Sequence, residues 1–194
     1  MISTQGLVIV VTGVPGVGKT TVADGLAQRL GGRHINLSNL AEEWGLITGW
    51  DEGRETAIVD LDGMYERVMR LRDSSKGPLI IEGHFAPDVV PPEVASFIFV
   101  LRRAPWRLKV ELEARGYGGE KVGENVDAEL LGVSLVEAVE AYGPERVCEM
   151  DTTGRTPEEV VDAALSIIRG DGVCNRGLID WLGRAEAGRL LEGR

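Results

Sequence analysis

A single stretch near the start of the chain, residues 7–21, most restricts the fold that this chain can adopt. It reads LVIVVTGVPGVGKTT, an apolar run followed by a glycine-rich segment and Lys-Thr-Thr. The run 7–11 is unbroken and rich in β-branched residues, which is typical of a strand buried on both faces of a parallel sheet. The glycines that follow match a phosphate-binding loop, which joins such a strand to a helix. The stretch therefore predicts an α/β fold of the P-loop class.

The residue types in this loop indicate how it would bind phosphate. Gly13 turns the chain after the strand, while Gly16 and Gly18 lack a Cβ atom and let backbone N–H groups converge on a phosphate at the start of the helix. Lys19 is placed to bridge the β- and γ-phosphates of a nucleotide, and the Thr20 hydroxyl is placed to bind Mg²⁺. The loop therefore predicts a nucleotide with Mg²⁺ as ligands.

Composition narrows the class of protein further. The chain has 194 residues, which suits one α/β domain, and its formal net charge of −10 argues against sequence-independent binding along a nucleic-acid backbone. No apolar run approaches the roughly 20 residues that span a bilayer, and because the first strand follows a short polar stretch we expect no signal peptide. Cys148 and Cys174 have neither metal-ligand nor redox spacing, so we expect reduced thiols in a cytoplasmic protein without membrane contact.

Buried strands and amphipathic helices alternate along the rest of the chain. Further strands are predicted at 34–36, 79–81, 97–101 and 147–150, and helices follow the loop to Gly31 and lie at 38–44, 58–71, 105–114, 125–142 and 157–168. Segments 46–56 and 115–119 are predicted to be irregular. Ser38 and Thr156 are expected to cap their helices, and Asp60 and Asp62 are interpreted as a helix cap and a first-turn charge rather than metal ligands.

The domain organisation follows from this alternation. We expect one domain at 1–169 and a C-terminal tail at 170–194 that is helical and carries apolar residues from Leu178 to Leu191. This tail either docks on its own core or forms a surface for a partner or a second copy.

Polar residues follow the predicted strand at 79–81, at the edge where an open α/β sheet places its chemistry. Glu82 and His84 are two positions apart, a spacing that puts both side chains on the same face of a strand end. A histidine at a strand end is ordinarily a hydrogen-bonding residue, and the neighbouring carboxylate favours a catalytic role for His84 instead.

The order of strand, loop and helix, with Asn36, the WDEGRET stretch, EGH at 82–84 and RGYGGEKVGEN at 115–125, resembles the adenylate kinase isoenzyme six family. These proteins are also called coilin-interacting nuclear ATPases and have archaeal relatives. The resemblance covers about 7–165. It implies a P-loop NTPase with an adenylate-kinase-like three-layer fold: a five-stranded parallel sheet, a short monophosphate-binding region at 36–60 and a short lid at 115–125.

The resemblance also implies roles for particular residues. Gly16, Gly18, Lys19, Thr20 and Thr21 resemble contacts to the phosphates of ATP.

Two arginines resemble further contacts to ATP: Arg115 resembles the lid arginine, and Arg155 falls where the family places a basic residue near adenine. Glu82 stands where many members carry an aspartate near Mg²⁺. Glu42 stands where a basic residue is common, which leaves Arg54, with Asn36, to bind the acceptor.

These expectations combine into a hypothesis of phosphoryl transfer from Mg·ATP to AMP or another nucleoside monophosphate, with Lys19, Glu82, His84 and Arg115 as catalytic residues. A second hypothesis is an assembly ATPase that remodels a small-subunit ribosomal protein or a pre-ribosomal particle, with kinase activity incidental. Another P-loop small-molecule kinase is the third, and the RGY lid sequence argues against it.

Overall fold

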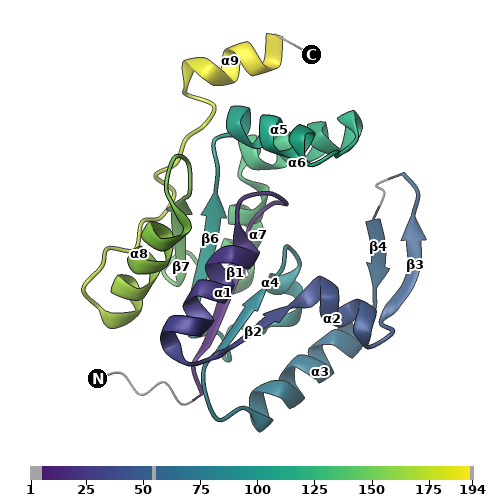
Figure 1. Cartoon of the computed structure of the whole chain (residues 1–194), viewed down its shortest axis with the longest axis vertical. Helices are drawn as coiled ribbons and strands as arrows, with labels where there is room; N and C mark the ends of the chain where they lie inside the picture. Colours follow the sequence, from purple (N-terminus) through teal and green to yellow (C-terminus); the bar gives the residue numbers. More distant parts are fainter. Residues whose placement is uncertain (1–5, 54–55, 193–194) are drawn as a thin grey trace.

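The computed structural model describes residues 6–53 and 56–192 of the chain, in which strands and helices alternate (Figure 1). The strands are β1 (Val8–Thr12), β2 (Arg33–Asn36), β3 (Ile47–Asp51), β4 (Thr56–Val59), β5 (Leu79–Glu82), β6 (Phe97–Arg102) and β7 (Val147–Asp151). The helices are α1 (Lys19–Leu30), α2 (Leu37–Glu43), α3 (Leu61–Ser74), α4 (Ala86–Val89), α5 (Pro105–Ala114), α6 (Gly119–Leu131), α7 (Val133–Tyr142), α8 (Pro157–Arg169) and α9 (Ala185–Glu192).

One parallel sheet of five strands organises the molecule, in the order β2-β5-β1-β6-β7. Every residue of β1 and β5 is buried, as expected for strands that are covered on both faces. The predicted fold class is therefore confirmed, and each predicted strand of this sheet is present.

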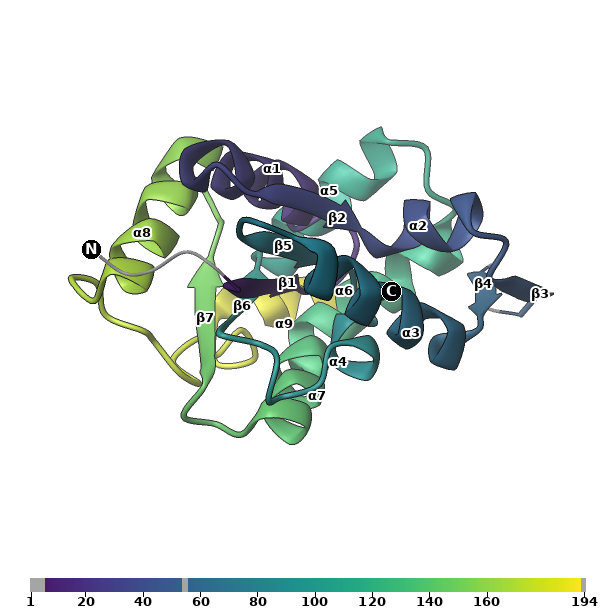
Figure 2. The ribbon, with the colours of Figure 1, turned by 90° about the horizontal axis from the view of Figure 1, so that it is seen from below.

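Helices cover both faces of the sheet and enclose two apolar cores (Figure 2). Helices α1 and α8 pack against each other on one face, around Leu26 and Val161, while α4 and α7 cover the other face. Gly31 ends α1 at φ +63, Asp60 caps α3 and Thr156 forms a capping box with Glu159, all as predicted. Within the described residues, no helix is long and apolar enough to cross a membrane.

Three local predictions are wrong. Segment 46–56 contributes to an antiparallel hairpin, β3–β4, and Ile58 belongs to β4 rather than to the helix, which begins at Leu61. The predicted helix at 125–142 begins earlier and is two helices, because Gly132 adopts φ +69 between α6 and α7. Asn36, not Ser38, caps α2 by accepting a hydrogen bond from the backbone N–H of Asn39 (2.9 Å).

The prediction of reduced thiols is also wrong, because Cys148 and Cys174 form a disulfide bond. Cys148 lies in β7, and the chain returns to this strand after α8, so that the backbone N–H of Glu149 donates to the carbonyl oxygen of Asn175 (2.8 Å). The return places Cys174 beside Cys148 across a sequence separation of 26 residues.

Candidate active site

The phosphate-binding loop, residues 13–18, connects β1 to α1 and is shaped by β6 and α5. Gly13, Gly16 and Gly18 have φ values of +136, +93 and +101. A Cβ atom on Gly13 would lie 2.5 Å from the Leu101 carbonyl oxygen, and one on Gly16 would lie 2.8 Å from Leu108 Cδ1. Gly18 has open space around it and caps α1, so only its backbone conformation favours glycine there. The loop therefore presents backbone at the N-terminus of α1, where an anion binds most readily.

Lys19, in the first turn of α1, points back over the loop. Its Nζ donates to the carbonyl oxygens of Gly13 (2.8 Å) and Val14 (3.0 Å). Burial lowers the pKa of Lys19 to about 8, against the opposing attraction of Glu82. The ammonium group therefore lies against the first two residues of the loop, where it can neutralise phosphate oxygens.

Glu82, the last residue of β5, has three side chains from α1 and β2 around one of its oxygens. Its Oε1 accepts hydrogen bonds from the Thr20 hydroxyl (2.8 Å) and from Asn36 Nδ2. His34 Nε2, which has no hydrogen-bond partner among the described residues, lies 3.6 Å from the same oxygen. Burial opposes ionisation of Glu82, but His34, Thr20 and Lys19 together outweigh it and lower its pKa. Glu82 is 2% exposed and carries a buried negative charge.

His84 lies beyond the end of β5, in a turn, so the period-two spacing of a strand does not extend to it. Its backbone carbonyl accepts from the Thr12 hydroxyl (3.4 Å), and its side chain lines a cavity with Phe85 and with Ala57 and Val59 of the hairpin. The residue is exposed, yet surrounding atoms partly desolvate the ring, and this desolvation with the charges of Lys19 and Lys121 lowers its pKa. The lowered pKa favours the neutral form of the imidazole, against the opposing charge of Glu82.

The remaining predicted residues lie outside this cluster. Arg115 ends α5 and is exposed, without an ion pair to any residue that the structure describes. Arg155 is exposed and donates to the carbonyl oxygens of Asp151 (3.4 Å) and Glu159 (2.7 Å). Thr21 is exposed on α1, and Arg54 lies outside the described residues.

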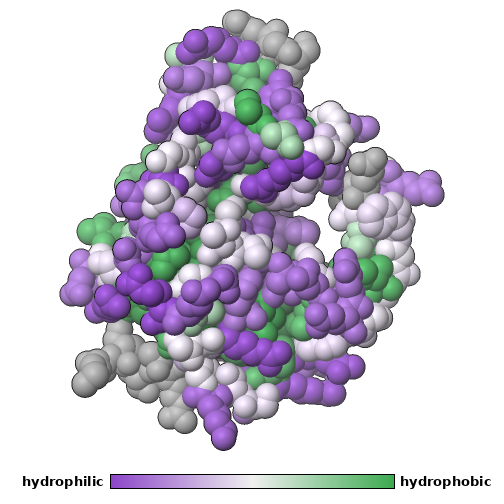
Figure 3. Space-filling view, viewed as in Figure 1, coloured by the Kyte–Doolittle hydropathy of each residue, from purple (hydrophilic) through white to green (hydrophobic). Residues whose placement is uncertain are grey.

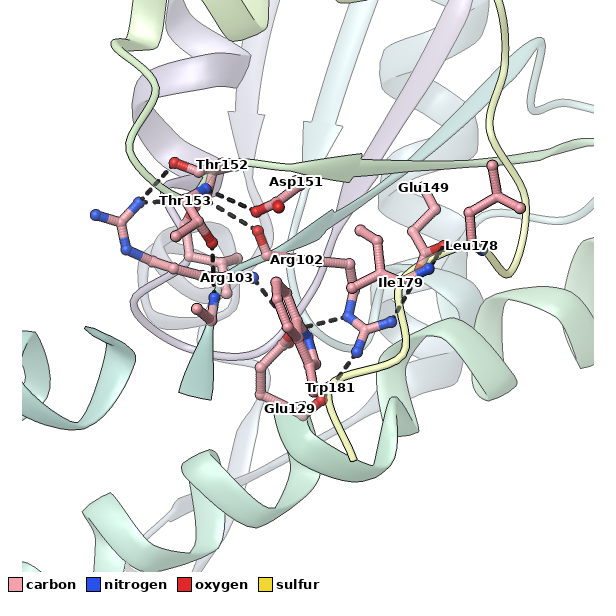
Figure 4. Close-up of polar contacts among 12 residues, drawn as sticks. Arg102, Arg103, Glu129, Glu149, Asp151, Thr152, Thr153, Leu178, Ile179 and Trp181 are labelled. Atoms are coloured by element: carbon pink, nitrogen blue, oxygen red, sulfur yellow. Dashed lines mark hydrogen bonds and ion pairs between the residues drawn. The ribbon is translucent and has the colours of Figure 1, made fainter. Parts of the chain in front are cut away.

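Arg103 and Thr152, which the sequence analysis did not identify, connect the loop to α5 through hydrogen bonds. Arg103 donates to the carbonyl oxygen (3.1 Å) and the hydroxyl (3.2 Å) of Thr152, and to Glu111 of α5 (2.5 Å). The Thr152 hydroxyl in turn donates to the carbonyl oxygen of Val17 in the loop (3.1 Å). Figure 4 shows Arg103 and Thr152 facing each other at the ends of their strands. No local motif marks these residues, because their partners come from distant parts of the chain.

The oxygen atoms at the site are ligands that suit a hard divalent cation. Thr20 and Glu82 are both oxygen donors, and their hydrogen bond places the two oxygens 2.8 Å apart at the start of α1. Mg²⁺ prefers oxygen ligands, and it commonly takes one or two from the protein while keeping several waters. The described residues hold no cluster of three or more histidine, cysteine or acidic side chains that would indicate a metal bound by the protein alone. The site therefore fits Mg²⁺ shared with phosphate.

The fold is that of the P-loop kinases. Shikimate kinase from Acinetobacter baumannii matches with a TM-score of 0.63 and 16% identity, over 85% of this chain and 94% of that chain. Thymidylate kinase from Candida albicans matches with a TM-score of 0.56 and 14% identity, over 88% of this chain and 94% of that chain. At these identities the likeness concerns the fold alone.

Sequence comparison identifies the family. A family pattern described as "AAA domain" matches residues 9–132. A protein of Thermococcus kodakarensis named "Putative adenylate kinase" is 43% identical over 177 residues, which cover 90% of this chain and 93% of the relative. A protein of the same name from Saccharolobus solfataricus is 38% identical over 186 residues, which cover 96% of this chain and 93% of the relative. The chain belongs to the family of these archaeal adenylate-kinase-like proteins.

Proposed function

We propose that this chain is an ATP-dependent nucleoside monophosphate kinase that transfers the γ-phosphoryl group of Mg·ATP to AMP. The position of Glu82 carries the proposal. Because β5 lies between β1 and β2, Glu82 is in register with Val11, just before the phosphate-binding loop, and with Asn36. Its carboxylate accepts from Thr20 on one side and from Asn36 on the other. One side chain thus connects the phosphate-donor loop to the start of segment 36–60, which we assign to the acceptor.

In this proposal catalysis rests on positioning and charge neutralisation, without a covalent intermediate. The loop N–H groups of Gly16 and Gly18 hold the phosphates, and Lys19 neutralises the group in transfer. Thr20 and Glu82 would hold Mg²⁺, which when bound neutralises charge on the phosphate oxygens. The buried charge of Glu82 keeps Thr20 oriented toward the site.

Arginines outside the cluster complete the proposed site. Segment 115–125 is the lid, and Arg115 reaches the phosphates when this segment closes. Arg155 contacts the adenine side of ATP, while Asn36 and Arg54 place the acceptor. The support comes from the space-filling view in Figure 3, which shows an open hollow, and Figure 1 in the same orientation places the α5–α6 pair on one side of it and the β3–β4 hairpin on the other.

ATP hydrolysis is a second candidate activity, and His84 supports it. A neutral, solvent-accessible imidazole can orient a water molecule or accept its proton. The resemblance to the isoenzyme six family extends this activity to an assembly ATPase that acts on a small-subunit ribosomal protein or a pre-ribosomal particle. A net charge of −10 would attract such a basic partner.

One assay separates these activities. ATP turnover is measured alone, with each nucleoside monophosphate, with a hydroxylated non-nucleotide acceptor and with a basic small-subunit ribosomal protein. We expect the greatest stimulation by AMP, with ADP formed from both substrates, and loss of turnover in Lys19→Ala. Stimulation only by the ribosomal protein would favour the assembly ATPase, and transfer to the non-nucleotide acceptor would identify another P-loop kinase.

His84→Ala tests the two activities within one protein. If His84 orients a water, hydrolysis falls in this variant while transfer to AMP is less affected, because AMP supplies its own oxygen nucleophile. The measurement is the ratio of ATPase to kinase rates in the variant and the parent at saturating Mg·ATP. Equal loss of both rates would show a shared or structural role.

A further inference from the structure

The C-terminal segment, residues 170–192, is fastened to β7 before it leaves the sheet. The disulfide joins Cys174 to Cys148 in this strand. The next residue of the strand, Glu149, accepts hydrogen bonds through Oε2 from the backbone N–H groups of Leu178 (3.0 Å) and Ile179 (3.3 Å). Because Glu149 is 2% exposed, these bonds form in a buried setting, where they are strong. The segment therefore starts its path from a fixed point.

Trp181 then enters the base of the α5–α6 helix pair. It is 1% exposed and belongs to a small core with Ala104 and Leu130. Its ring meets the edge of Trp106, in the first turn of α5, with centroids 5.7 Å apart. Leu130 lies in the last turn of α6. One side chain thus contacts both ends of the helix pair that are nearest the sheet, and α9 continues outward over α5 and α6 (Figure 1).

The indole N–H of Trp181 is one of three donors on a single buried oxygen. Glu129 Oε1 accepts from Trp181 Nε1 (2.8 Å), from Arg102 Nε (2.7 Å) and from the backbone N–H of Arg103 (3.1 Å), as Figure 4 shows. Arg102 also bonds Glu149 (2.5 Å), so one guanidinium serves two buried carboxylates. Burial raises the pKa of Glu129, and its hydrogen-bond donors oppose that rise. Each of these hydrogen bonds therefore stabilises the charged carboxylate, because a buried carboxylate that loses a hydrogen-bond donor has no water to replace it.

Hydrogen bonds connect this cluster to the phosphate-binding loop. Arg103 follows Arg102 at the end of β6, and its side chain bonds Thr152 and Glu111 of α5. Thr152 bonds Val17 in the loop. Contacts therefore run from Trp181 through Glu129 and the two arginines to the loop, and from Arg103 to α5.

We propose that Trp181 is a positioning residue: it holds the base of the α5–α6 pair so that the segment between these helices, with Arg115, closes from a fixed orientation. The inference rests on the proposed function in that it names segment 115–125 as the lid. The tip of the pair contains Gly116, Gly118 and Gly119, where an added Cβ atom would have no neighbour within 4 Å, whereas its base packs against Trp181. The lid therefore has a free end near the substrates and a clamped end at the tail.

Hydrogen exchange in the full chain tests the clamp without any assay of activity. Trp181→Phe keeps an aromatic ring and removes the N–H, and Leu182→Ala, at an exposed position next to it, is the matched control. We expect amides of α6 to exchange at least about tenfold faster in Trp181→Phe, the effect of losing one hydrogen bond to a charged group, while amides of β1 and α1 and those of the control are unchanged. Equal acceleration throughout the chain, or no acceleration in α6, would overturn the inference.

Kinetics then test the connection to Arg115. In Trp181→Phe we expect kcat for phosphoryl transfer to fall about tenfold while the ATP dissociation constant changes less than about twofold. Arg115→Ala should lower kcat less in the Trp181→Phe background than in the parent, because both changes impair the same closure. Fully multiplicative effects would overturn the inference. If the parent transfers no phosphoryl group, the proposed function fails, and the exchange pattern alone decides whether Trp181 clamps the helix pair.

Discussion

Lys19 is expected to make nucleotide binding depend on pH. Its pKa in the protein is about 8, below the ordinary 10.5, and bound phosphates would raise it again. ATP affinity should therefore be constant below pH 7 and fall as the pH rises through 8 to 9, where binding must be accompanied by proton uptake.

Calorimetry in buffers of different ionisation enthalpy measures this uptake. Lys76→Ala, a change at an exposed lysine, should leave it intact. Binding at pH 9 without proton uptake would show that Lys19 is already charged in the free protein.

Glu82→Gln is expected to raise the Mg²⁺ requirement of phosphoryl transfer. The substitution keeps the size of the side chain and removes the buried charge that Thr20 and Asn36 bond. We expect the Mg²⁺ concentration for half-maximal rate to rise at least about tenfold, as when an outer partner of a metal site is removed. A titration of the rate with MgCl₂ measures it, with Glu93→Gln at an exposed position as control. An unchanged requirement would remove Glu82 from the proposed metal site.

Residues of the candidate site could be predicted where neighbouring sequence positions mark them. Lys19 and Thr20 follow from one contiguous motif, and Glu82 follows from its place after a buried strand. The sequence does not show that β5 lies between β1 and β2, and this order is what brings Asn36 and His34 to Glu82. Neighbours across a parallel sheet come from distant segments, so His34 carried no signal of its own.

The contact between the phosphate-binding loop and α5 predicts different costs for two glycine substitutions. Gly16 and Gly18 both have positive φ, so alanine at either position costs about 1–2 kcal/mol of backbone strain. Only Gly16 faces α5, where Leu108 and Leu112 lie 2.8 and 3.0 Å from the added Cβ, which adds about 1–3 kcal/mol of overpacking. Urea unfolding without nucleotide measures the difference. Equal destabilisation by alanine at Gly16 and at Gly18 would show that α5 moves aside for the added Cβ atom without a cost in stability.

Elements with a regular apolar pattern were predicted well, and those with glycines in irregular positions were not. The hairpin β3–β4 was not predicted because Gly49 and Gly53 interrupt the alternation of side chains and a bulge shifts the register between Ile47 and Gly49. Its apolar residues Ile47 and Ile58 are also exposed, so they lack the burial that usually marks a strand. Gly132 is hard to interpret because glycine is tolerated within helices, and only its φ of +69 shows the break.

For the molecule as a whole, reduction of the disulfide is expected to lower thermal stability. The bond closes a loop of 26 residues that includes α8, and restricting such a loop in the unfolded chain is worth about 3.5 kcal/mol. We expect the melting temperature to fall by about 10 °C when a thiol reductant is added.

Scanning calorimetry with and without the reductant measures this change. The Cys174→Ser variant should melt at the lower temperature and ignore the reductant. A parent protein whose melting is unaffected by reduction would contradict the stabilising role of the bond.

The attachment of the C-terminal segment to β7 could not be predicted from the sequence. The two cysteines have no recognised spacing, and their proximity depends on the chain returning to β7 after α8. Arg102, Glu129 and Glu149 each occupy a position where an apolar residue is the common choice, and their charges are acceptable only because the three meet. Such a meeting is a property of the assembled fold.

The four tryptophans give this protein an optical signal on each side of its hollow. Trp50, on the hairpin, is 61% exposed, and Trp44 lies under Arg67 at the end of α2. Trp106 and Trp181 form a pair at the base of α5 and α6. Indole emission shifts to shorter wavelength when water is excluded, and Trp50 is the one exposed ring among the four. Intrinsic fluorescence, with iodide quenching to isolate Trp50, can therefore follow the hairpin and the helix pair separately in unlabelled protein.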